Sequence, residues 1–288
     1  MKNVCCLILP VFILLYSVAA VASADAEKGK WTRNVKISAE LNGEKFEATY
    51  SVYIPSKRSS DSITVLLLHD YNGSSNDWIR ESVFTREAEK RNYVLIAPDM
   101  KMSAYENEFY PETKVKWSPV PGAKWIGEFL IPHAKSNFGA FSSREKTMIA
   151  GAGMGGRGAF ICAARYPKYF KYVAGFSGYY DNETLKRNSA LNNLFGSYKE
   201  NPERWKTCDS PLVLADNLSN MILFLSHGIE DYIVSPDQSV MFGVKLNSVK
   251  KKNSNVDFRY YTNKYGMHDW NMFNSGTAAF LSFVDEKR

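Results

Sequence analysis

The sequence predicts an α/β fold: a mainly parallel, doubly wound sheet with helices on both faces. Segments with the pattern of strands alternate along the chain with segments typical of helices, which is the order found in parallel sheets. The run from Ile63 to Leu68 consists only of leucine and β-branched residues, as expected for a strand buried on both faces. Because no repeat, low-complexity tract or linker divides the chain, we expect residues 25–288 to form one domain.

The expected elements can be placed in order. Residues 34–54 alternate apolar and polar side chains around Asn42-Gly43, which is typical of a β-hairpin. Pro132 should kink or restart the helix that contains it. Residues 181–220 are polar and are expected to be irregular, with Trp205 as their main anchor. The remaining strands are expected at 63–68, 93–97, 147–150, 172–176, 221–226 and 256–261, and the helices at 76–91, 125–136, 157–166, 238–250 and 271–286.

The first 24 residues have the pattern of a secretory signal peptide. Lys2 precedes an apolar stretch at 4–20, and Ala22-Ser23-Ala24 is a small-x-small cleavage site before Asp25. We therefore predict a secreted or periplasmic protein that begins at Asp25, with no stable membrane span after cleavage. The alternative is an uncleaved membrane anchor, which Pro10 and the modest apolar length disfavour.

Composition limits the expected partners. The formal net charge is +6, but the positive residues are scattered. The densest run, Lys250-Lys251-Lys252, follows a predicted helix and should complement its C-terminus, so we expect no nucleic-acid partner. We expect no cofactor, and no metal because no Cys/His group has metal-ligand spacing. Cys162 and Cys208 follow the signal peptide, and they are expected either to form a disulfide or to remain as thiols.

The most informative motif is Gly151-Ala-Gly153-Met154-Gly155, which lies between a predicted strand and a predicted helix. Strand, glycine-rich turn and helix are the layout of the nucleophile elbow, whose usual pattern is G-x-S-x-G. Gly153 stands where that pattern has its serine. The motif therefore predicts the scaffold of a serine hydrolase without its nucleophile. Ser177 follows the next strand but lacks such a turn, so we do not expect it to substitute.

Two later loops carry the other residues of a catalytic triad. In this layout the chain order is nucleophile, acid, histidine, each on a separate loop at a strand end. Asp231 follows the predicted strand at 221–226 and is the expected acid. Glu230 is the alternative acid, and the alternative role for Asp231 is a structural one, capping of the helix that follows. His268 lies between the last strand and the last helix and is the expected base.

Oxyanion stabilisation in this layout comes from two backbone N–H groups. One belongs to the residue after the nucleophile, here Met154. The other belongs to the loop after an early strand, Leu68-His69-Asp70-Tyr71-Asn72-Gly73, where Tyr71 is the expected donor. Because the N-terminus of the helix predicted at 157–166 lies directly behind Met154, we expect the two groups to bind a carbonyl or carboxylate group of a ligand.

The sequence resembles the esterase family of the α/β-hydrolases, which includes S-formylglutathione hydrolases, feruloyl and acetyl-xylan esterases and the antigen 85 mycolyltransferases. The resemblance covers residues 45–285 and implies the α/β-hydrolase fold. It also implies that Asp231 and His268 are the triad acid and base. The matching segments are Leu66-Leu67-Leu68-His69 with the glycine-bearing loop that follows, Ala97-Pro98-Asp99, Met154-Gly155-Gly156-Arg157-Gly158-Ala159, Ala164-Arg165-Tyr166-Pro167 with Phe170, Phe176-Ser177-Gly178, Trp205, Ser210-Pro211-Leu212, Asp216-Asn217-Leu218, His227-Gly228 with Asp231, and Gly266 with His268 and Trp270.

The chain departs from the family pattern at two positions. Gly153 replaces the serine, and His69-Asp70 stands where the family has His-Gly, so Asp70 is expected to stiffen or re-aim the oxyanion loop. We therefore predict an exported homologue that is inactive or nearly so and binds a small-molecule ester, acyl or carbohydrate ligand. One alternative is an active carboxylic-ester hydrolase that uses water held by His268, and another is a parent protein with serine at 153. If one oxygen atom alone is missing, Gly153→Ser should restore esterase activity.

Overall fold

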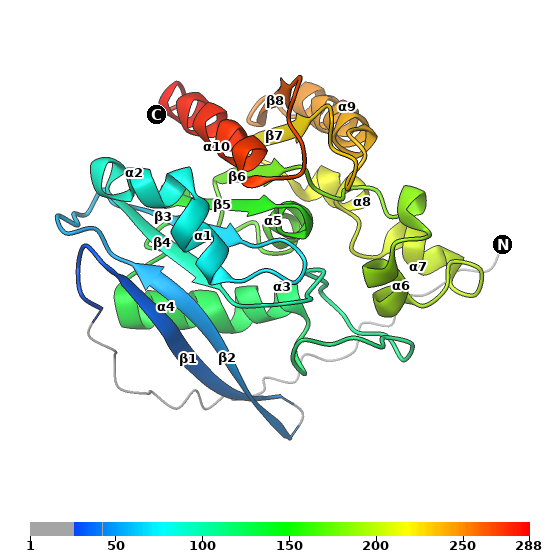
Figure 1. Ribbon diagram of the computed structural model, residues 1–288, viewed down its shortest axis with the longest axis horizontal. Helices are drawn as coiled ribbons and strands as arrows, with labels where there is room; N and C mark the ends of the chain where they lie inside the picture. The colour runs from blue at the N-terminus through cyan, green and yellow to red at the C-terminus, as the bar shows by residue number, and fades with distance from the viewer. Residues whose placement is uncertain (1–25, 42) are drawn as a thin grey trace.

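The computed structural model describes residues 26–41 and 43–288 and confirms the predicted fold class. One sheet of eight strands lies between two layers of helices (Figure 1). The predicted signal peptide, and Asn42 of the predicted hairpin, lie outside the described residues. Within the described ranges, no helix is both long enough and apolar enough to cross a membrane.

The order of strands in the sheet is β1-β2-β4-β3-β5-β6-β7-β8. β1 and β2 form the predicted hairpin, and β2 also pairs antiparallel with β4; the pairs from β4 through β3 to β8 are all parallel. Five of the six parallel strands contain only buried residues, which explains their largely apolar sequences; the exception is the edge strand β8. The strands are β1 (Trp31–Leu41), β2 (Glu44–Tyr53), β3 (Ile63–Leu68), β4 (Tyr93–Pro98), β5 (Thr147–Ala152), β6 (Tyr172–Phe176), β7 (Ile222–Gly228) and β8 (Asp257–Asn263).

The order of the strands changes direction between β3 and β5. β4 lies on one side of β3, whereas β5 and all later strands lie on the other. In doubly wound sheets, ligand sites form at such a switch point, at the carboxyl ends of the strands. The loop that contains Asp70 follows β3 and Gly153 follows β5, so the topology brings these two residues together.

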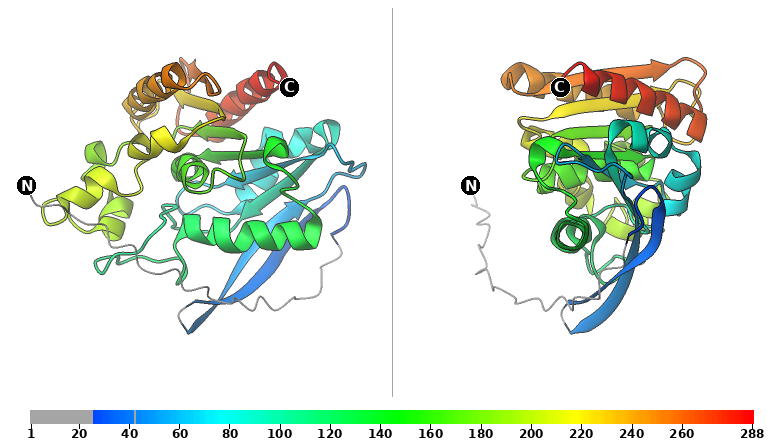
Figure 2. Two further views of the ribbon diagram at one scale, coloured as in Figure 1. Left: turned by 180° about the vertical axis from the view of Figure 1, so that it is seen from behind. Right: turned by 90° about the vertical axis from the view of Figure 1, so that its left-hand side faces the viewer.

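Helices cover the two faces of the sheet and bury two separate cores (Figure 2). Trp78, Phe84 and Phe280 fill the core on the face covered by α1, α2 and α10. Phe160 and Phe242 fill the core on the face covered by α4, α5 and α9. These helices are α1 (Ser75–Glu81), α2 (Val83–Arg91), α4 (Ile131–Phe138), α5 (Met154–Arg165), α9 (Asp237–Lys252) and α10 (Trp270–Asp285).

The predicted helix at 76–91 is two helices, because Ser82 interrupts it. Ser82 has an extended backbone, ends α1 and begins α2, and its hydroxyl accepts the N–H of Phe84. The N-terminal cap of α1 is Ser74, which forms a capping box with Asp77. This cap precedes Asn76, where the sequence had indicated the start of the helix. Helix boundaries are uncertain by one or two residues, so two helices that adjoin at a serine cap are difficult to distinguish in a sequence from one longer helix.

At the place where Pro132 was expected to kink or restart a helix, the helix changes from a π-helical turn to an α-helix. The four-residue α3 (Gly122–Trp125) continues into a π-helical turn, η1 (Ile126–Leu130), and then into α4. Pro132 lies in the first turn of α4, where a missing N–H is tolerated.

The prediction that residues 181–220 are irregular is wrong. This segment contains three short α-helices, and Trp205 is fully buried among them with its indole N–H donating to the carbonyl of Gly196 at 3.1 Å. The helices are too short to show a clear period in the sequence. They are α6 (Ser189–Phe195), α7 (Pro202–Thr207) and α8 (Pro211–Leu214), accompanied by the 3-10 turns η3 (Glu183–Leu185) and η4 (Ala215–Asn217); a further such turn, η2 (Arg144–Lys146), precedes β5.

The two cysteines of the described chain are both free thiols. Cys162 is buried in α5, and Cys208 is partly buried at the end of α7. The sequence left open either a disulfide or two thiols, and the structure has the two thiols.

The close packing of α5 on β3 depends on Gly155, and we predict that Gly155→Ala is strongly destabilising. A Cβ atom at this position would lie 2.1 Å from the carbonyl oxygen of Leu68, which is backbone and cannot turn away. Overpacking of this kind costs about 1–3 kcal/mol or more in free energy of unfolding. Urea denaturation measures the loss.

Gly243→Ala in α9 is the matched control, because the nearest atom to its added Cβ is 3.5 Å away. This control should be neutral or slightly stabilising. Equal stability of the two variants would contradict the close approach of α5 and β3.

Candidate functional site

The turn between β5 and α5 has the geometry of a nucleophile elbow. Gly153 has φ 53° and ψ −119°, and its N–H donates to the carbonyl of Phe176 at 2.9 Å. A positive φ is a conformation that side-chain-bearing residues adopt only at a cost of about 1–3 kcal/mol. Glycine adopts it without that cost. The chain therefore turns as the sequence motif predicted, on a residue that carries no side chain.

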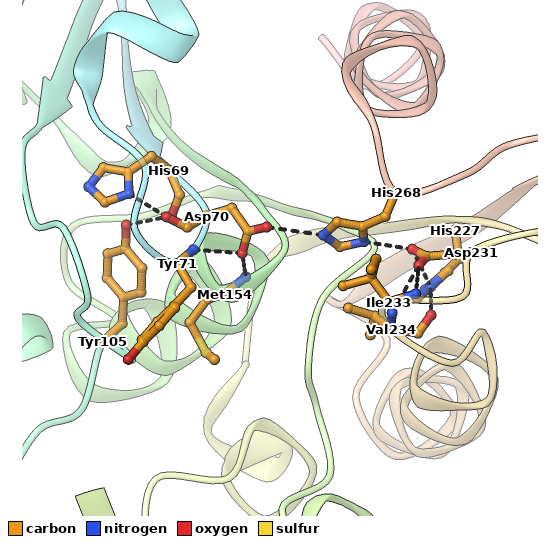
Figure 3. A network of polar contacts seen from close by, with 10 residues as sticks. All are labelled: His69, Asp70, Tyr71, Tyr105, Met154, His227, Asp231, Ile233, Val234 and His268. Carbon is orange, nitrogen blue, oxygen red and sulfur yellow. Dashed lines mark hydrogen bonds and ion pairs between the residues drawn. The ribbon is translucent and has the colours of Figure 1, made fainter. Parts of the chain in front are cut away.

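The two N–H groups predicted to form an oxyanion hole lie together, and both are occupied by this chain's own Asp70. Oδ1 of Asp70 accepts the N–H of Tyr71 at 2.7 Å and the N–H of Met154 at 2.6 Å (Figure 3). Met154 is the first residue of α5, where the helix dipole also favours a negative charge. The carboxylate thus occupies the place expected for a ligand's oxygen atom.

The second oxygen of Asp70 faces the predicted base. Oδ2 lies 3.0 Å from Nε2 of His268, and Nδ1 of His268 lies 2.7 Å from Oδ2 of Asp231. Figure 3 shows the three side chains in a row, with the imidazole between the two carboxylates. The structure thus brings Asp231 and His268 together as the sequence predicted, and adds Asp70 at the position where a nucleophile would approach the imidazole.

Gly153 and Asp70 compete for the same space. A Cβ atom built on Gly153 would lie 2.1 Å from Oδ1 of Asp70 and 2.2 Å from its Cγ. No side chain can therefore begin at position 153 while the carboxylate of Asp70 is in place. The expectation that one oxygen atom alone is missing from the site is wrong, because the carboxylate also blocks the position.

The contacts within the row formed by Asp70, His268 and Asp231 determine the charges of these three side chains. Burial alone would lower the pKa of His268, but its hydrogen bonds with Asp231 and Asp70 and the charges of both carboxylates raise it to about 9. Burial would likewise raise the pKa of Asp231, but hydrogen bonds from His227, His268 and the N–H of Val234 hold it well below its usual range. At neutral pH the imidazole is therefore cationic between two anions, and the row carries one net negative charge.

Asp231 is fixed from behind by a second histidine and two backbone groups. Its Oδ1 accepts the N–H groups of Ile233 and Val234, each at 2.9 Å, and its Oδ2 lies 3.3 Å from Nε2 of His227. That nitrogen also faces the carbonyl of Val234 at 3.0 Å, so it carries the proton, and Nδ1 of His227 accepts from the hydroxyl of Ser239 at 2.6 Å. His227 is therefore a structural support of the acid.

The loop that carries Asp70 is held by His69 and Tyr105. Nε2 of His69 accepts the N–H of Met100 at 2.8 Å, so Nδ1 carries the proton and donates to the carbonyl of Asp70 at 2.6 Å. Burial lowers the pKa of His69 and keeps it neutral. The hydroxyl of Tyr105 donates to the carbonyl of His69 at 2.8 Å. Both peptide carbonyls beside Asp70 are thus fixed, which orients its side chain toward the elbow.

Other candidates lie outside the row. Glu230 is exposed, and its N–H donates to the carbonyl of Gly266. His133 pairs with the hydroxyl of Tyr50 at 2.9 Å. Ser177 is buried with φ 48°, and its hydroxyl has no partner within the described chain. No group of three His, Cys, Asp or Glu side chains in the described ranges is arranged to hold a metal ion.

Two contributors to the site were not assigned from the sequence. The departure at Asp70 was visible, but its carboxylate was not expected in the oxyanion hole. Tyr179 is half-buried near the row, and burial together with the charges of Asp70 and Asp231 raises the pKa of its phenol. The only signal for Asp70 was a charged residue in a loop whose backbone donors were expected to bind an anion.

Comparison with known proteins finds similarity to esterases. The model of the Esterase family matches residues 38–281. The chain is also 25% identical over 243 residues to an acetyl esterase of Caldicellulosiruptor saccharolyticus, a match that covers 77% of this chain and 83% of that protein.

Solved structures share its fold. An S-formylglutathione hydrolase from Agrobacterium tumefaciens superposes with a TM-score of 0.68 at 17% identity, over 88% of this chain and 98% of that one. The fluorophosphonate-binding serine hydrolase FphF of Staphylococcus aureus gives a TM-score of 0.65 at 18% identity, over 90% of this chain and 99% of that one. At these identities the likeness concerns the fold.

We predict that His268 stays protonated well above neutral pH, with a pKa of about 9. Because this value exceeds the roughly 6.5 of an unfolded histidine, the row stabilises the folded protein fully below about pH 6.5. That stabilisation, at most about 3 kcal/mol, is lost as the pH rises through the folded pKa. The chain has only four histidines, so an NMR titration resolves them.

Asp70→Asn should lower the pKa of His268, because it removes one of the two carboxylates that hold the proton. His133→Gln is the control and should leave the titration of His268 unchanged. A His268 that titrates near 6.5 in the unmodified protein would exclude the row as described.

Proposed function

The chain belongs to the esterase family, and from that premise we propose that it is an exported homologue that does not hydrolyse carboxylic esters through an acyl-enzyme. The observation that carries the proposal is the position of the Asp70 carboxylate. One of its oxygens accepts hydrogen bonds from both oxyanion donors, and the other is hydrogen-bonded to the imidazole of His268. Gly153 supplies no nucleophile at the elbow.

Acyl transfer needs an attacking hydroxyl, a free base and an empty oxyanion hole. Asp70 engages the last two at once. It also weighs against ester hydrolysis by water held at His268, because Nε2 of His268 already faces Oδ2 of Asp70 at 3.0 Å. A cationic imidazole with a pKa of about 9 has no free lone pair on Nε2 for a water proton at neutral pH.

For the ligand, we propose a neutral small molecule of the ester or carbohydrate type. The net negative charge of the row disfavours a free carboxylate, so the expected binding of acids by Met154 and Tyr71 is revised. The loops that hold Asp231 and His268 present exposed apolar and aromatic side chains, which suit a phenolic ester or a sugar face. These side chains are Ile229, Tyr232, Ile233, Tyr265 and Met267.

We predict that Gly153→Ser alone stays inactive and that Asp70→Gly together with Gly153→Ser gains esterase chemistry. The serine Cβ of the single variant would collide with the Asp70 carboxylate. Removing that carboxylate frees the position, both donors and the base. A fluorophosphonate probe should label the double variant and neither the unmodified protein nor the single variant. Hydrolysis of p-nitrophenyl acetate should rise about 10²-fold or more.

His268→Ala in the double variant should abolish both gains, because the added serine needs its base. Circular dichroism checks that each variant is folded. Brisk, His268-dependent ester hydrolysis by the unmodified protein would overturn the proposal. Strong labelling of Gly153→Ser alone would show that Asp70 moves aside readily.

A further inference from the structure

We propose that Asp70 is itself a nucleophile, and that the site opens neutral epoxides by forming and then hydrolysing an alkyl ester on this carboxylate. The inference rests on the placement of Asp70 that also supports the proposed function. It goes beyond that function because it gives the site a reaction of its own, with a neutral epoxide as substrate in place of an ester or a sugar. It follows from the three groups that contact the two oxygens of Asp70.

The two oxygens of Asp70 have different environments. Oδ1 is held by two N–H groups, those of Tyr71 and Met154, whereas Oδ2 has one partner within the described chain, His268. The side chain of Asp70 is 33% exposed, while that of Asp231 is fully buried. Asp70 therefore combines access from solvent, a fixed orientation and a free lone pair on Oδ2, which Asp231 does not.

The product of attack decides which electrophile suits a carboxylate. Attack on an ester carbonyl would give an anhydride, which is higher in energy than the ester it came from. Attack on an sp³ carbon gives an ordinary ester, which persists until water is activated against it. A strained three-membered ring supplies the driving force for that attack.

In the first step Oδ2 of Asp70 attacks a ring carbon, and a new Oδ2–C bond forms as the ring C–O bond breaks. The ring oxygen leaves as an alkoxide that stays attached to the substrate. It takes up the proton that the imidazolium of His268 releases, directly or through solvent. Asp70 is now a neutral ester and His268 a neutral base that remains oriented by Asp231.

In the second step water attacks Cγ of the ester and gives a proton to Nε2 of His268. Negative charge develops on Oδ1, which already lies 2.7 Å and 2.6 Å from the N–H groups of Tyr71 and Met154. The Cγ–Oδ2 bond then breaks, and the leaving alkoxide takes the proton from His268. Asp70 is left with one oxygen from water, and its acid proton returns to His268. The net reaction is epoxide plus water to vicinal diol.

The charge of the row favours an epoxide over an alkyl halide. A departing halide needs donors of its own, but the two N–H groups of the hole are taken by Oδ1. The row also carries a net negative charge that disfavours a free anion. An epoxide needs only a proton, which the imidazolium holds. The exposed Ile233 and Met267 beside the row favour an apolar or aryl substituent on the ring.

The test uses the mature chain with styrene oxide as the probe. His268→Gln should open the ring slowly but fail to hydrolyse the ester, so one substrate mass per chain should accumulate on the peptide that contains Asp70. Diol formation by this variant should fall at least about 10²-fold relative to the unmodified protein. Asp70→Asn should show neither adduct at that peptide nor diol. Glu230→Gln, which removes an exposed carboxylate from the neighbouring loop, should behave as the unmodified protein.

Isotope labelling separates this route from direct attack of water on the ring. In H₂¹⁸O, repeated turnover by the unmodified protein should place ¹⁸O in the carboxylate of Asp70. Absence of an Asp70 adduct in folded His268→Gln, or diol formation without ¹⁸O in Asp70, would overturn the inference. The proposed function would survive that result if the Asp70→Gly, Gly153→Ser variant still gains probe labelling.

Discussion

The carboxylate of Asp70 is held by two backbone N–H groups on one oxygen and by an imidazole on the other, and the rest of the site depends on this interaction. Removing a carboxylate from water is costly unless hydrogen bonds replace its hydration. Here the positive end of α5 and the cationic His268 supply that replacement. The contacts of His268 with Asp70 and Asp231 raise the pKa of the imidazole, so two carboxylates and one imidazolium leave the row with one net negative charge.

Asp70 and Gly153 are physically coupled. The carboxylate can reach the donors only because position 153 has no Cβ, and a Cβ at 153 would need the carboxylate to leave. A change at either position is therefore best understood together with the other. His69 and Tyr105 reinforce the arrangement by fixing the carbonyls on both sides of the Asp70 backbone.

Local patterns predicted most of the scaffold. Uniformly apolar runs identified the buried parallel strands, and the glycines at 151, 153 and 155 identified the turn into α5. Chain order, together with a position on loops at strand ends, was enough to pair Asp231 with His268. The helices at 181–220 were missed because segments of four to seven residues show little period. The orientation of Asp70 could not be predicted, since it depends on donors from two other segments that only the folded sheet brings together.

The most direct test is a high-resolution crystal structure of the protein at neutral pH, with attention to the two N–H groups of Tyr71 and Met154. We expect Oδ1 of Asp70 within hydrogen-bond distance of both nitrogens and Oδ2 in contact with His268. A water molecule or buffer anion between those N–H groups, with the side chain of Asp70 turned toward solvent, would contradict it.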